Sequence, residues 1–365
     1  MPDLDDRSRF EFFRDLTSLP QDGARLWLLE SVDSYFLSRG WFECLLAEGL
    51  DAGDRVALGV LQSADGRVLA LLPARFTDDD RRRSPRRRLR GMTGIYACVY
   101  RPILPPDANI SATARSLGLN LGRALTARDV IALDALDGEW PGWPGFESGL
   151  RQAGFRSARY AHFGNWSEPV GDRSFEQYLA ARSGALREIV RRRQRALERD
   201  GARFAVISSG EGLDEAIATY EAVYARSWKP AEPYPRFHDR LMRTAARDGV
   251  LRLGLCHVGE RPVAAQIWIV WRRAATVLKL AHDREFDRYS PGSVLIAHMV
   301  RHVLECDRAI EIDFGRGDDP YKREWATRRR QRFGLIAASP RSLAGLAMLL
   351  RQFAGRCLAA FRWRE

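Results

Sequence analysis

The chain is 365 residues long, which is enough for two domains, and 45% of its residues are hydrophobic, which excludes an intrinsically disordered protein. Its 58 lysines and arginines against 47 acidic residues give a formal charge of +11 and favour anionic partners such as phosphates, tRNA or an acidic membrane face. The sequence has no run of about 18 apolar residues and no apolar stretch at its start, so we expect neither a membrane-spanning helix nor a signal peptide. These patterns predict a cytoplasmic protein.

The cysteines and histidines show no metal-ligand spacing. The five cysteines are scattered, so we expect reduced and mostly buried thiols at Cys44, Cys98, Cys256, Cys306 and Cys357. His298 and His302 stand one helical turn apart, but no third ligand accompanies them. We therefore predict no metal site.

The first half of the chain alternates between helix and strand patterns. In chain order, we predict a helix over 34–49, strands over 56–61 and 68–76, a strand over 91–100, a helix over 110–125, a strand over 130–136 and a helix that ends near 154. A similar order of elements follows in the second half. The two halves therefore predict two related domains in tandem.

Arginine supplies most of the positive charge and is clustered. One cluster covers 81–83 and 86–90 in a predicted loop, a second covers 187–195 on a predicted helix, and a third covers 328–332. Each cluster either binds a polyanion or forms a solvated face. Because aromatic residues do not alternate with these arginines, the pattern argues against single-stranded nucleic acid.

Residues 174–201 carry helix signals that connect the two halves. Ser174 and Gln177 have the spacing of a capping box. The apolar face of this helical stretch is opposed by arginines, of which Arg187 and Arg191 are candidates to bind phosphate or carboxylate through their guanidinium forks. A solvated face is the alternative. Further helices are predicted over 219–229 and 237–247.

From residue 250 onward, the chain predicts a three-stranded meander, a helix, a buried strand, a glycine turn and another helix. Ser290 is expected to cap the first of these helices, which runs to Glu305, and Pro291 suits its first position. The start of a helix presents unpaired N–H groups and the positive end of its dipole. We therefore predict an anion site, for a phosphorylated ligand, at 290–294.

The most specific motif of the chain is the string Asp313-Phe314-Gly315-Arg316-Gly317, followed by Tyr321-Lys322 and Trp325. Supporting segments are Ser227-Trp228-Lys229, 263–266 and Ser290-Pro291-Gly292. This order of parts resembles the core of the GNAT acyltransferases. It resembles most the CelD-type branch, associated with cellulose and exopolysaccharide and with a BioF-like acetyltransferase domain, which is related to the FemABX peptidyltransferases. The resemblance extends from about Leu26 to Ile336.

The resemblance implies an α+β fold of two tandem GNAT-like domains, each with a mostly antiparallel central sheet flanked by helices, plus a C-terminal amphipathic helix. The implied parts are an N-terminal segment (1–25), a degenerate first domain (26–170), the acyltransferase domain (171–338) and the C-terminal helix (339–365). The first domain lacks the glycine motif and a clear anion-binding helix start. We therefore expect it to be a scaffold that walls the acceptor cleft.

The resemblance also implies catalytic residues. Asp313 is a candidate to position or deprotonate the acceptor, with bonding of the glycine turn as the alternative. Tyr321 is a candidate to protonate the leaving thiolate, with a packed aromatic residue as the alternative. His282 is a rival base, with a structural role as the alternative. No nucleophile elbow or Cys–His pair occurs, so direct transfer is favoured.

The remaining implied residues contact the two substrates. Those expected to bind the cofactor are Leu280, Ala281, Tyr289, Ser290, Pro291, Gly292, Ser293 and Val294. Those expected to bind the acceptor are Arg187, Arg191, Trp228, Lys229, Gln266, Arg316, Lys322 and Trp325. Simple packing is the alternative for the two tryptophans.

These observations predict an N- or O-acyltransferase that moves an acyl group, acetyl above all, from acetyl-CoA or another acyl-CoA to a sugar, amino acid or small metabolite without a metal. One alternative is a Fem-like enzyme that takes an aminoacyl group from aminoacyl-tRNA, which the basic helix favours. Another is a non-enzymatic binding protein with a decayed GNAT fold, against which the intact glycine motif argues.

Residues 339–365 predict an amphipathic helix with Ser339 as its cap, Pro340 at its first position and arginines beside an apolar stripe. Such a helix docks on the protein's own body, pairs with a second subunit, or lies on the inner face of an anionic membrane.

Overall fold

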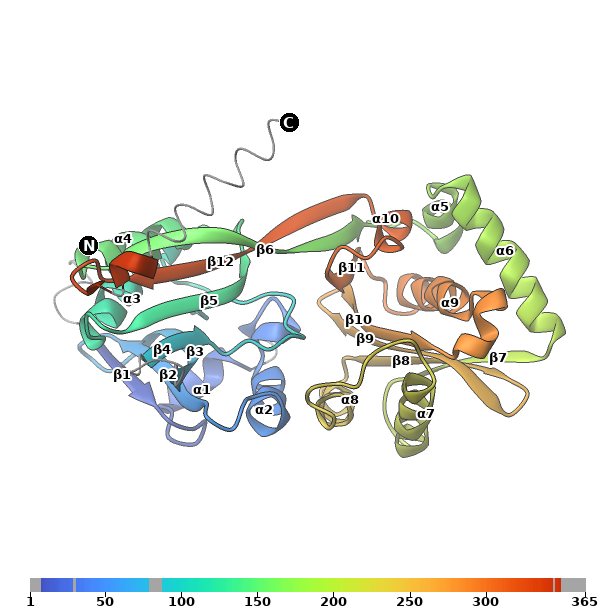
Figure 1. Ribbon diagram of the computed structural model, residues 1–365, viewed down its shortest axis with the longest axis horizontal. Coiled ribbons are helices and arrows are strands. Elements are labelled where there is room, and N and C mark those ends of the chain that lie inside the picture. Colours follow the sequence, from blue (N-terminus) through green and yellow to red (C-terminus); the bar gives the residue numbers. More distant parts are fainter. Residues whose placement is uncertain (1–7, 29–30, 79–86, 344, 349–365) are drawn as a thin grey trace. The chain divides into compact units, whose positions relative to one another are not determined.

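The structure is a computed structural model that describes residues 8–28, 31–78, 87–343 and 345–348. The chain divides into two compact units (Figure 1). The first unit comprises Met1–Leu45, Leu50–Phe163 and Gln331–Glu365, and the second comprises Leu46–Gly49 and Gly164–Arg330. No helix within the described ranges is long and apolar enough to cross a membrane.

The first unit is built on a sheet with the strand order β1-β2-β3-β4-β5-β12-β6. Its strands are β1 (Arg9–Phe13), β2 (Arg55–Gln62), β3 (Val68–Asp78), β4 (Arg87–Gly91), β5 (Val130–Asp137), β6 (Arg156–Pro169) and β12 (Arg328–Ala338). Its helices are α1 (Gln21–Leu26), η2 (Tyr35–Leu37), α2 (Arg39–Glu48), α3 (Ile110–Ala124) and α4 (Trp143–Gln152). Strands β1 to β4 pair antiparallel, β4 and β5 pair parallel, and β12 pairs antiparallel with β5.

The second unit has the strand order β6-β11-β10-β9-β8-β7. Its further strands are β7 (Ala202–Ile207), β8 (Leu251–Val258), β9 (Arg261–Trp271), β10 (Ala274–His282) and β11 (Glu311–Arg316). Its helices are α5 (Phe175–Ala180), α6 (Gly184–Arg199), α7 (Leu213–Ala225), α8 (Phe237–Arg247), η3 (Arg284–Tyr289), α9 (Pro291–Glu305) and α10 (Lys322–Trp325). In Figure 1, α9 lies on one face of this sheet and α7 and α8 on the other.

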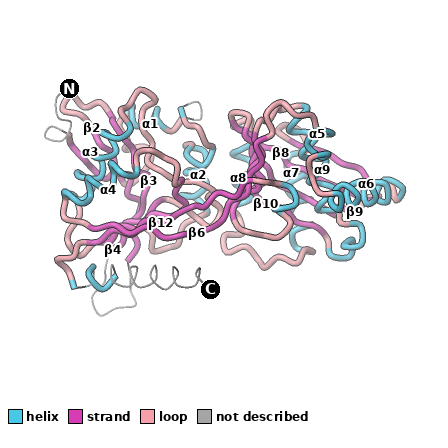
Figure 2. Tube along the Cα trace, turned by 90° about the horizontal axis from the view of Figure 1, so that it is seen from above, coloured by secondary structure: helices cyan, strands magenta, loops and turns pink. Residues whose placement is uncertain are grey.

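The two units repeat one order of elements. Four antiparallel strands are followed by a helix (α3 or α9), a strand parallel to the fourth (β5 or β11), a further helix (α4 or α10) and a long last strand (β6 or β12). The last strands are exchanged, because β6 pairs with β11 and β12 pairs with β5. Figure 2 shows β6 and β12 as long strands that run beside each other. The predicted mixed fold, with mostly antiparallel strands flanked by helices, is confirmed.

Each unit has its own apolar core. In the first unit, Leu117, Phe146 and Leu335 belong to one buried cluster. Helices α3 and α4 pack closely there, because a Cβ atom on Gly118 or Gly149 would overlap the backbone of the facing helix. In the second unit, large buried side chains such as Trp268, Tyr178 and Leu295 fill the space between the sheet and its helices.

A buried carboxylate ties β6 to the end of α10 in the second unit. Glu168 is 2% exposed and accepts hydrogen bonds from Arg182 at 2.7 Å, Arg173 at 2.8 Å and the backbone N–H of Thr327 at 2.9 Å. Burial alone would raise the pKa of Glu168, but its hydrogen bonds from Thr327, Arg173 and Arg182 outweigh burial and hold the pKa below its ordinary value. This carboxylate therefore stabilises the corner where β12 begins.

Some predicted elements were wrong. The strand expected over 91–100 is instead β4, which ends at Gly91, so Arg87, Arg88 and Arg90 lie in a strand and not in a loop. The chain turns after Gly91 because the N–H of Thr93 donates to its carbonyl. The helix expected over 219–229 is α7, which begins at Leu213 and ends at Ala225. The predicted capping box at Ser174 and Gln177 is confirmed.

Other predictions fall partly outside the described residues. Arginines 81–83 and Arg86 belong to the undescribed stretch 79–86, and the expected C-terminal helix lies outside the described residues apart from 339–343 and 345–348. Of the cysteines, Cys44, Cys98 and Cys256 are free and buried and Cys306 is free and exposed.

Candidate functional site

Strands β10 and β11 part in the middle of the second unit. They pair in parallel over three positions, from Ala274↔Glu311 to Thr276↔Asp313. Beyond that point β10 continues to His282 alongside β9, while β11 turns toward β6 through an irregular register. The facing edges beyond Thr276 therefore carry backbone N–H and C=O groups outside the β10–β11 ladder.

A bulge lies in β10 just after the strands part. The register between β10 and β9 shifts between Val277 and Lys279, so Leu278 is the extra residue. The ammonium of Lys279 then pairs with Glu232 at 2.5 Å, and the hydroxyl of Tyr224 also donates to Glu232. The bulge thus places a cation and a carboxylate beside the open edge.

Helix α9 begins directly after β10 and η3, with an open first turn. The side chain of Ser290 makes no capping hydrogen bond, which corrects the predicted cap, and its backbone is left-handed with φ of 47°. The Ser290 carbonyl instead accepts from the N–H groups of Ser293 and Val294 at 3.0 and 3.2 Å, and Pro291 opens the helix as predicted. The Ser290 side chain therefore does not compete with an anion for this helix start.

Two side chains fix the position of that first turn. The amide of Gln266 is fully buried, donates to the Gly292 carbonyl at 2.9 Å and accepts from the Trp268 indole at 2.9 Å. Both polar groups of Gln266 are thus used internally, so it positions α9 and does not face an acceptor as predicted. A Cβ atom at Gly292 would lie 3.1 Å from Nδ1 of His282, so the glycine lets this ring approach the helix.

His282 connects the start of α9 to the loop after α7. Its Nε2 lies 2.8 Å from a carboxylate oxygen of Asp287, and its buried Nδ1 has no hydrogen-bond partner among the described residues. The ring also lies 4.5 Å from the ring of Trp228, and Nζ of Lys229 lies 5.5 Å from the Trp228 ring. Nδ1 is thus the ring nitrogen that has no described partner.

A cluster of mixed charge, which we call the lysine–acid cluster, surrounds Lys229. Its members are Lys229, Glu232, Lys279 and Asp319. Lys229 is half-buried, and its pKa lies below the ordinary value because of burial first and the ammonium of Lys279 second, which outweigh the two carboxylates. Within the described ranges, no group of three or more His, Cys, Asp or Glu residues forms a metal site.

Asp313 holds the glycine turn. Its carboxylate accepts hydrogen bonds from the Gly315 N–H at 2.7 Å, the Asn165 amide at 2.6 Å and the Arg330 guanidinium at 2.7 Å. Gly315 has a φ of 69°, which favours glycine. The turn-bonding alternative predicted for Asp313 is therefore present in the structure, and it leaves little of the carboxylate for a proton acceptor.

The residues after the glycine turn are also held internally. The buried ammonium of Lys322 donates to the carbonyl groups of Arg316 and Gly317 at 2.5 and 3.3 Å, so it does not face a ligand as predicted. Trp325 is 1% exposed and belongs to the core. Burial raises the pKa of Tyr321, so its hydroxyl stays protonated at neutral pH.

The other predicted residues are dispersed. Arg187 and Arg191 lie on the exposed face of α6, where Arg191 pairs with Glu188. The hydroxyl of Tyr289 donates to Asp200, at the end of α6. Leu280 and Ala281 lie on β10 opposite Gln266 and Ala265 of β9.

The structure thus gathers His282, Trp228 and Lys229 near the start of α9. Sequence analysis missed Glu232 and Lys279. The sequence feature that could have marked Lys279 as a site residue is its charge in an otherwise apolar strand. Glu232 lies in a loop flanked by prolines, where a charged residue is not unusual.

Part of the second unit, including the region around the start of α9, matches a protein-family model. Residues 184–323 match the family model described as "Acetyltransferase (GNAT) domain", a range that includes β10, α9 and β11. A search of curated proteins found no match. Residues 184–323 are therefore similar to a GNAT acetyltransferase domain, which supports a transferase.

Solved structures show the same fold at low identity. A structure described as FemX is similar over 87% of this chain and 96% of that chain, with a TM-score of 0.59 and 13% identity. A conserved protein of unknown function from Bacteroides thetaiotaomicron VPI-5482 is similar over 90% of this chain and 99% of that chain, with a TM-score of 0.50 and 12% identity. At such identities the likeness establishes the fold alone.

Proposed function

We propose that this protein transfers an acyl group, acetyl in the simplest case, from acyl-CoA directly to an amine or hydroxyl of a small acceptor such as an amino acid or sugar. The observation that carries the proposal is the parting of β10 and β11 beside the uncapped start of α9. A parted pair of parallel strands and an open helix start are the two features that an extended, phosphorylated donor requires.

The donor matches these two features in turn. The pantetheine arm of CoA is extended and carries amide groups, so it suits the backbone edge of β10 beyond Thr276 in the manner of an added strand. The diphosphate suits the first turn of α9, where the helix dipole favours negative charge and the Ser290 side chain makes no capping hydrogen bond. In this arrangement the thioester lies near the bulge at Leu278.

The lysine–acid cluster supports an acceptor that carries both signs of charge. Lys229 and Lys279 suit a carboxylate, while Glu232 and Asp319 suit an amine. An amino acid or amino sugar presents such a pair of groups within a small volume. We therefore expect zwitterionic or amino-bearing acceptors to outperform simple alcohols.

Proton transfer uses two side chains. Nδ1 of His282, which has no described partner, accepts the proton of the attacking amine, and the hydroxyl of Tyr321 protonates the leaving thiolate. In the transfer, the acceptor nitrogen forms a bond to the acyl carbon while the carbon–sulfur bond breaks, so no acyl-enzyme is required.

The test is an acetyl-CoA transfer assay that measures release of the free thiol against a panel of amino acids and amino sugars. We expect His282→Gln and Tyr321→Phe each to lower kcat about 100-fold. His257→Gln on β8 and Tyr96→Phe in the first unit are matched controls that should keep full activity. No thiol release with any acceptor, or full activity in both site variants, would refute the proposal.

A second candidate is aminoacyl transfer from tRNA, as in the Fem-like proteins. The observation that favours it is a hollow of about 660 Å³ on the exposed face of α6, lined by Arg191, Arg192, Arg195 and Arg199 together with two glutamates. Such a row of guanidinium groups suits a polyanion.

Titration with aminoacylated and free tRNA at physiological salt distinguishes the two donors. For the tRNA donor, aminoacylated tRNA should bind in preference to free tRNA, and Arg192→Gln with Arg195→Gln should weaken it at least tenfold. Equal, weak binding of both forms of tRNA would remove this candidate.

A further inference from the structure

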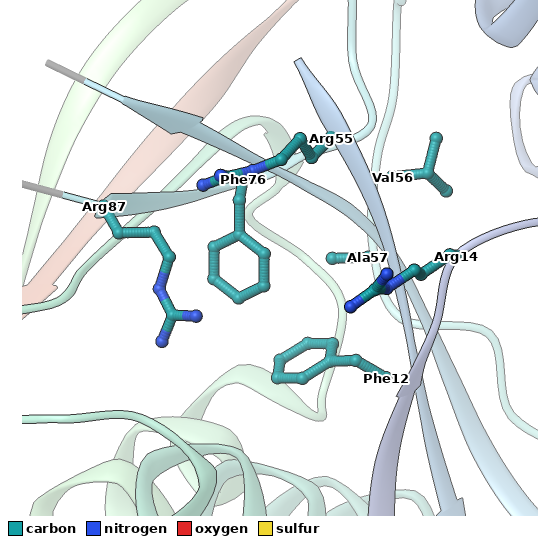
Figure 3. A pocket seen from close by; sticks show the side chains of 7 residues that line it. All are labelled: Phe12, Arg14, Arg55, Val56, Ala57, Phe76 and Arg87. Carbon is teal, nitrogen blue, oxygen red and sulfur yellow. The ribbon is translucent and has the colours of Figure 1, made fainter. Parts of the chain in front are cut away.

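A second hollow, of about 700 Å³, lies in the first unit, in a part of the chain outside the acetyltransferase match (Figure 3). Its walls come from β1, β2, β3 and β4, so it belongs to the sheet of that unit alone. A hollow of this size falls in the range of small-molecule sites.

The strand register explains why space remains there. Arg55 of β2 lies opposite Phe76 of β3, two residues further on Ala57 lies opposite Ala74, and Phe12 of β1 lies opposite Gly59 of β2. These residues share one face of the sheet, because side chains alternate along a strand. The small residues Ala57, Gly59 and Ala74 therefore leave space beside the two aromatic rings.

The two rings form an apolar floor. Phe12 and Phe76 meet edge to face with ring centroids 5.2 Å apart, and both belong to the core of the first unit or pack against it. Ala57 lies beside the two rings in the wall, as Figure 3 shows. An apolar body placed here would cover aromatic surface.

Three arginines surround this floor, and one of them is fixed. Arg87 forms a two-pronged pair with Asp129, at 2.8 and 3.1 Å, and the Asp129 side chain is only 6% exposed. The Arg87 guanidinium also lies 4.3 Å from the Phe76 ring centroid. Arg87 therefore contributes a fixed positive wall and remains committed to Asp129.

The other two arginines are available to a ligand. Arg55 pairs with Asp78 at 3.0 Å, but both side chains are exposed, and such surface pairs are weak. Arg14 makes no ion pair or hydrogen bond with any described residue, and its guanidinium points over Ala57 and Phe12 in Figure 3. Among the described residues, no acidic side chain lines the hollow. The charges of Arg87 and Arg55 are balanced by Asp129 and Asp78, whereas Arg14 has no described counter-charge.

We propose that this hollow binds an amphiphilic monoanion, with its apolar body on the Phe12–Phe76 floor and a carboxylate held by Arg14 and Arg55. A single negative charge matches the single surplus cation, and a guanidinium fork matches a carboxylate. The occupant is a free carboxylic acid with a hydrocarbon chain or ring. This site is independent of the acyl transfer proposed for the second unit.

Calorimetric titration of the full chain with decanoate tests the site. We expect saturable binding at one site, and at least tenfold weaker binding by neutral decanol and by acetate, which lack the charge and the apolar body respectively. The double variant Arg14→Gln/Arg55→Gln should weaken decanoate at least tenfold, and so should Ala57→Leu, which fills the floor but keeps the charges. Arg67→Gln, an exposed arginine of the same unit paired with Asp107, should bind decanoate as the parent does.

Three outcomes would overturn the proposal: unchanged decanoate binding in the double glutamine variant, decanol binding as tight as decanoate, or binding to phosphatidylglycerol vesicles without binding of free decanoate. The last result would mean a basic surface and not a pocket. Thermal unfolding of each variant identifies any that fail to fold. In that case decanoate binding by the single variant Arg14→Gln decides between the outcomes, because the Arg14 side chain has no described hydrogen bond or ion pair to lose.

Discussion

The two units share one order of elements but differ at the start of the helix that follows the fourth strand. In the first unit, α3 is closed, because the side chain of Asn109 accepts a hydrogen bond from the N–H of Ala112 at 3.1 Å. In the second unit, α9 starts at the left-handed Ser290 and has no side-chain cap. Both units contain a three-residue parallel pairing between the fourth and fifth strands.

This difference shows that the fold alone does not decide whether a helix start has a side-chain cap. The same strand–helix–strand order occurs twice, but a single asparagine fills the helix start in the first unit. In the second unit the start stays open, and His282 and the lysine–acid cluster lie beside it. We therefore propose that the donor binds to the second unit, and four experiments test the properties of the two units.

The largest expected effect is on the stability of the second unit. Glu168→Gln leaves the buried Arg182 without its counter-charge and presents an amide N–H to existing donors. We expect a loss of about 4 kcal/mol in the free energy of unfolding, measured by urea denaturation. Glu260→Gln, whose side chain is 94% exposed, is the matched control and should change stability little.

The next effect is a pH dependence of the stability of the second unit. Burial lowers the pKa of His238 to about 4, so the folded second unit keeps this ring neutral while the unfolded chain takes up a proton below about pH 6.5. The contribution of the buried neutral His238 ring to the free energy of unfolding is fully present above pH 6.5 and is lost as the pH falls toward 4.

Urea denaturation of the parent and of His238→Phe at two pH values measures this contribution. Between pH 7.5 and 5 we expect the parent to lose about 2 kcal/mol more than the variant. Equal losses would show that His238 does not titrate as the structure indicates.

The third effect is on donor binding. Valine at Gly292 would crowd the His282 ring and the first turn of α9. We expect Gly292→Val to weaken acetyl-CoA binding about 100-fold, or about 2.7 kcal/mol. Gly53→Val is the control, because a Cβ atom there meets nothing within 4 Å. Unaltered binding by Gly292→Val would place the donor elsewhere.

The smallest effect tests the contrast between the two helix starts. Asn109→Ala removes a cap and should cost about 1 kcal/mol of stability, whereas Ser290→Ala removes no capping bond and should cost much less. Thermal unfolding of the two variants measures the difference. Similar losses would mean that the two helix starts are alike.

The sequence predicted the elements with strong local patterns. The meander, the helix to Glu305 and the glycine turn at Gly315 and Gly317 all occur, because alternation, a proline at the first helical position and positive φ at glycine are local effects. Strands β6 and β12 were missed, because their exchange between sheets is a long-range pairing, and β12 also begins with charged residues.

The candidate site was predictable only in part. His282, Trp228 and Lys229 were named from the sequence, and the structure brings them together. The internal hydrogen bond of Gln266 was not predictable, since its acceptor is the carbonyl of Gly292, 26 residues further along the chain. That of Lys322 to the Arg316 carbonyl depends on how the glycine turn folds back, which the residue types alone do not give. The pairing of Lys279 with Glu232 joins residues 47 positions apart, which is likewise a tertiary effect.

The most direct test of donor binding in the second unit is calorimetric titration of the full chain with acetyl-CoA. We expect one binding site per chain, with binding weakened by Gly292→Val and unchanged by Gly53→Val and by Asn109→Ala. If acetyl-CoA does not bind, or if Asn109→Ala changes its affinity while Gly292→Val does not, then the open helix start of the second unit is not the donor site.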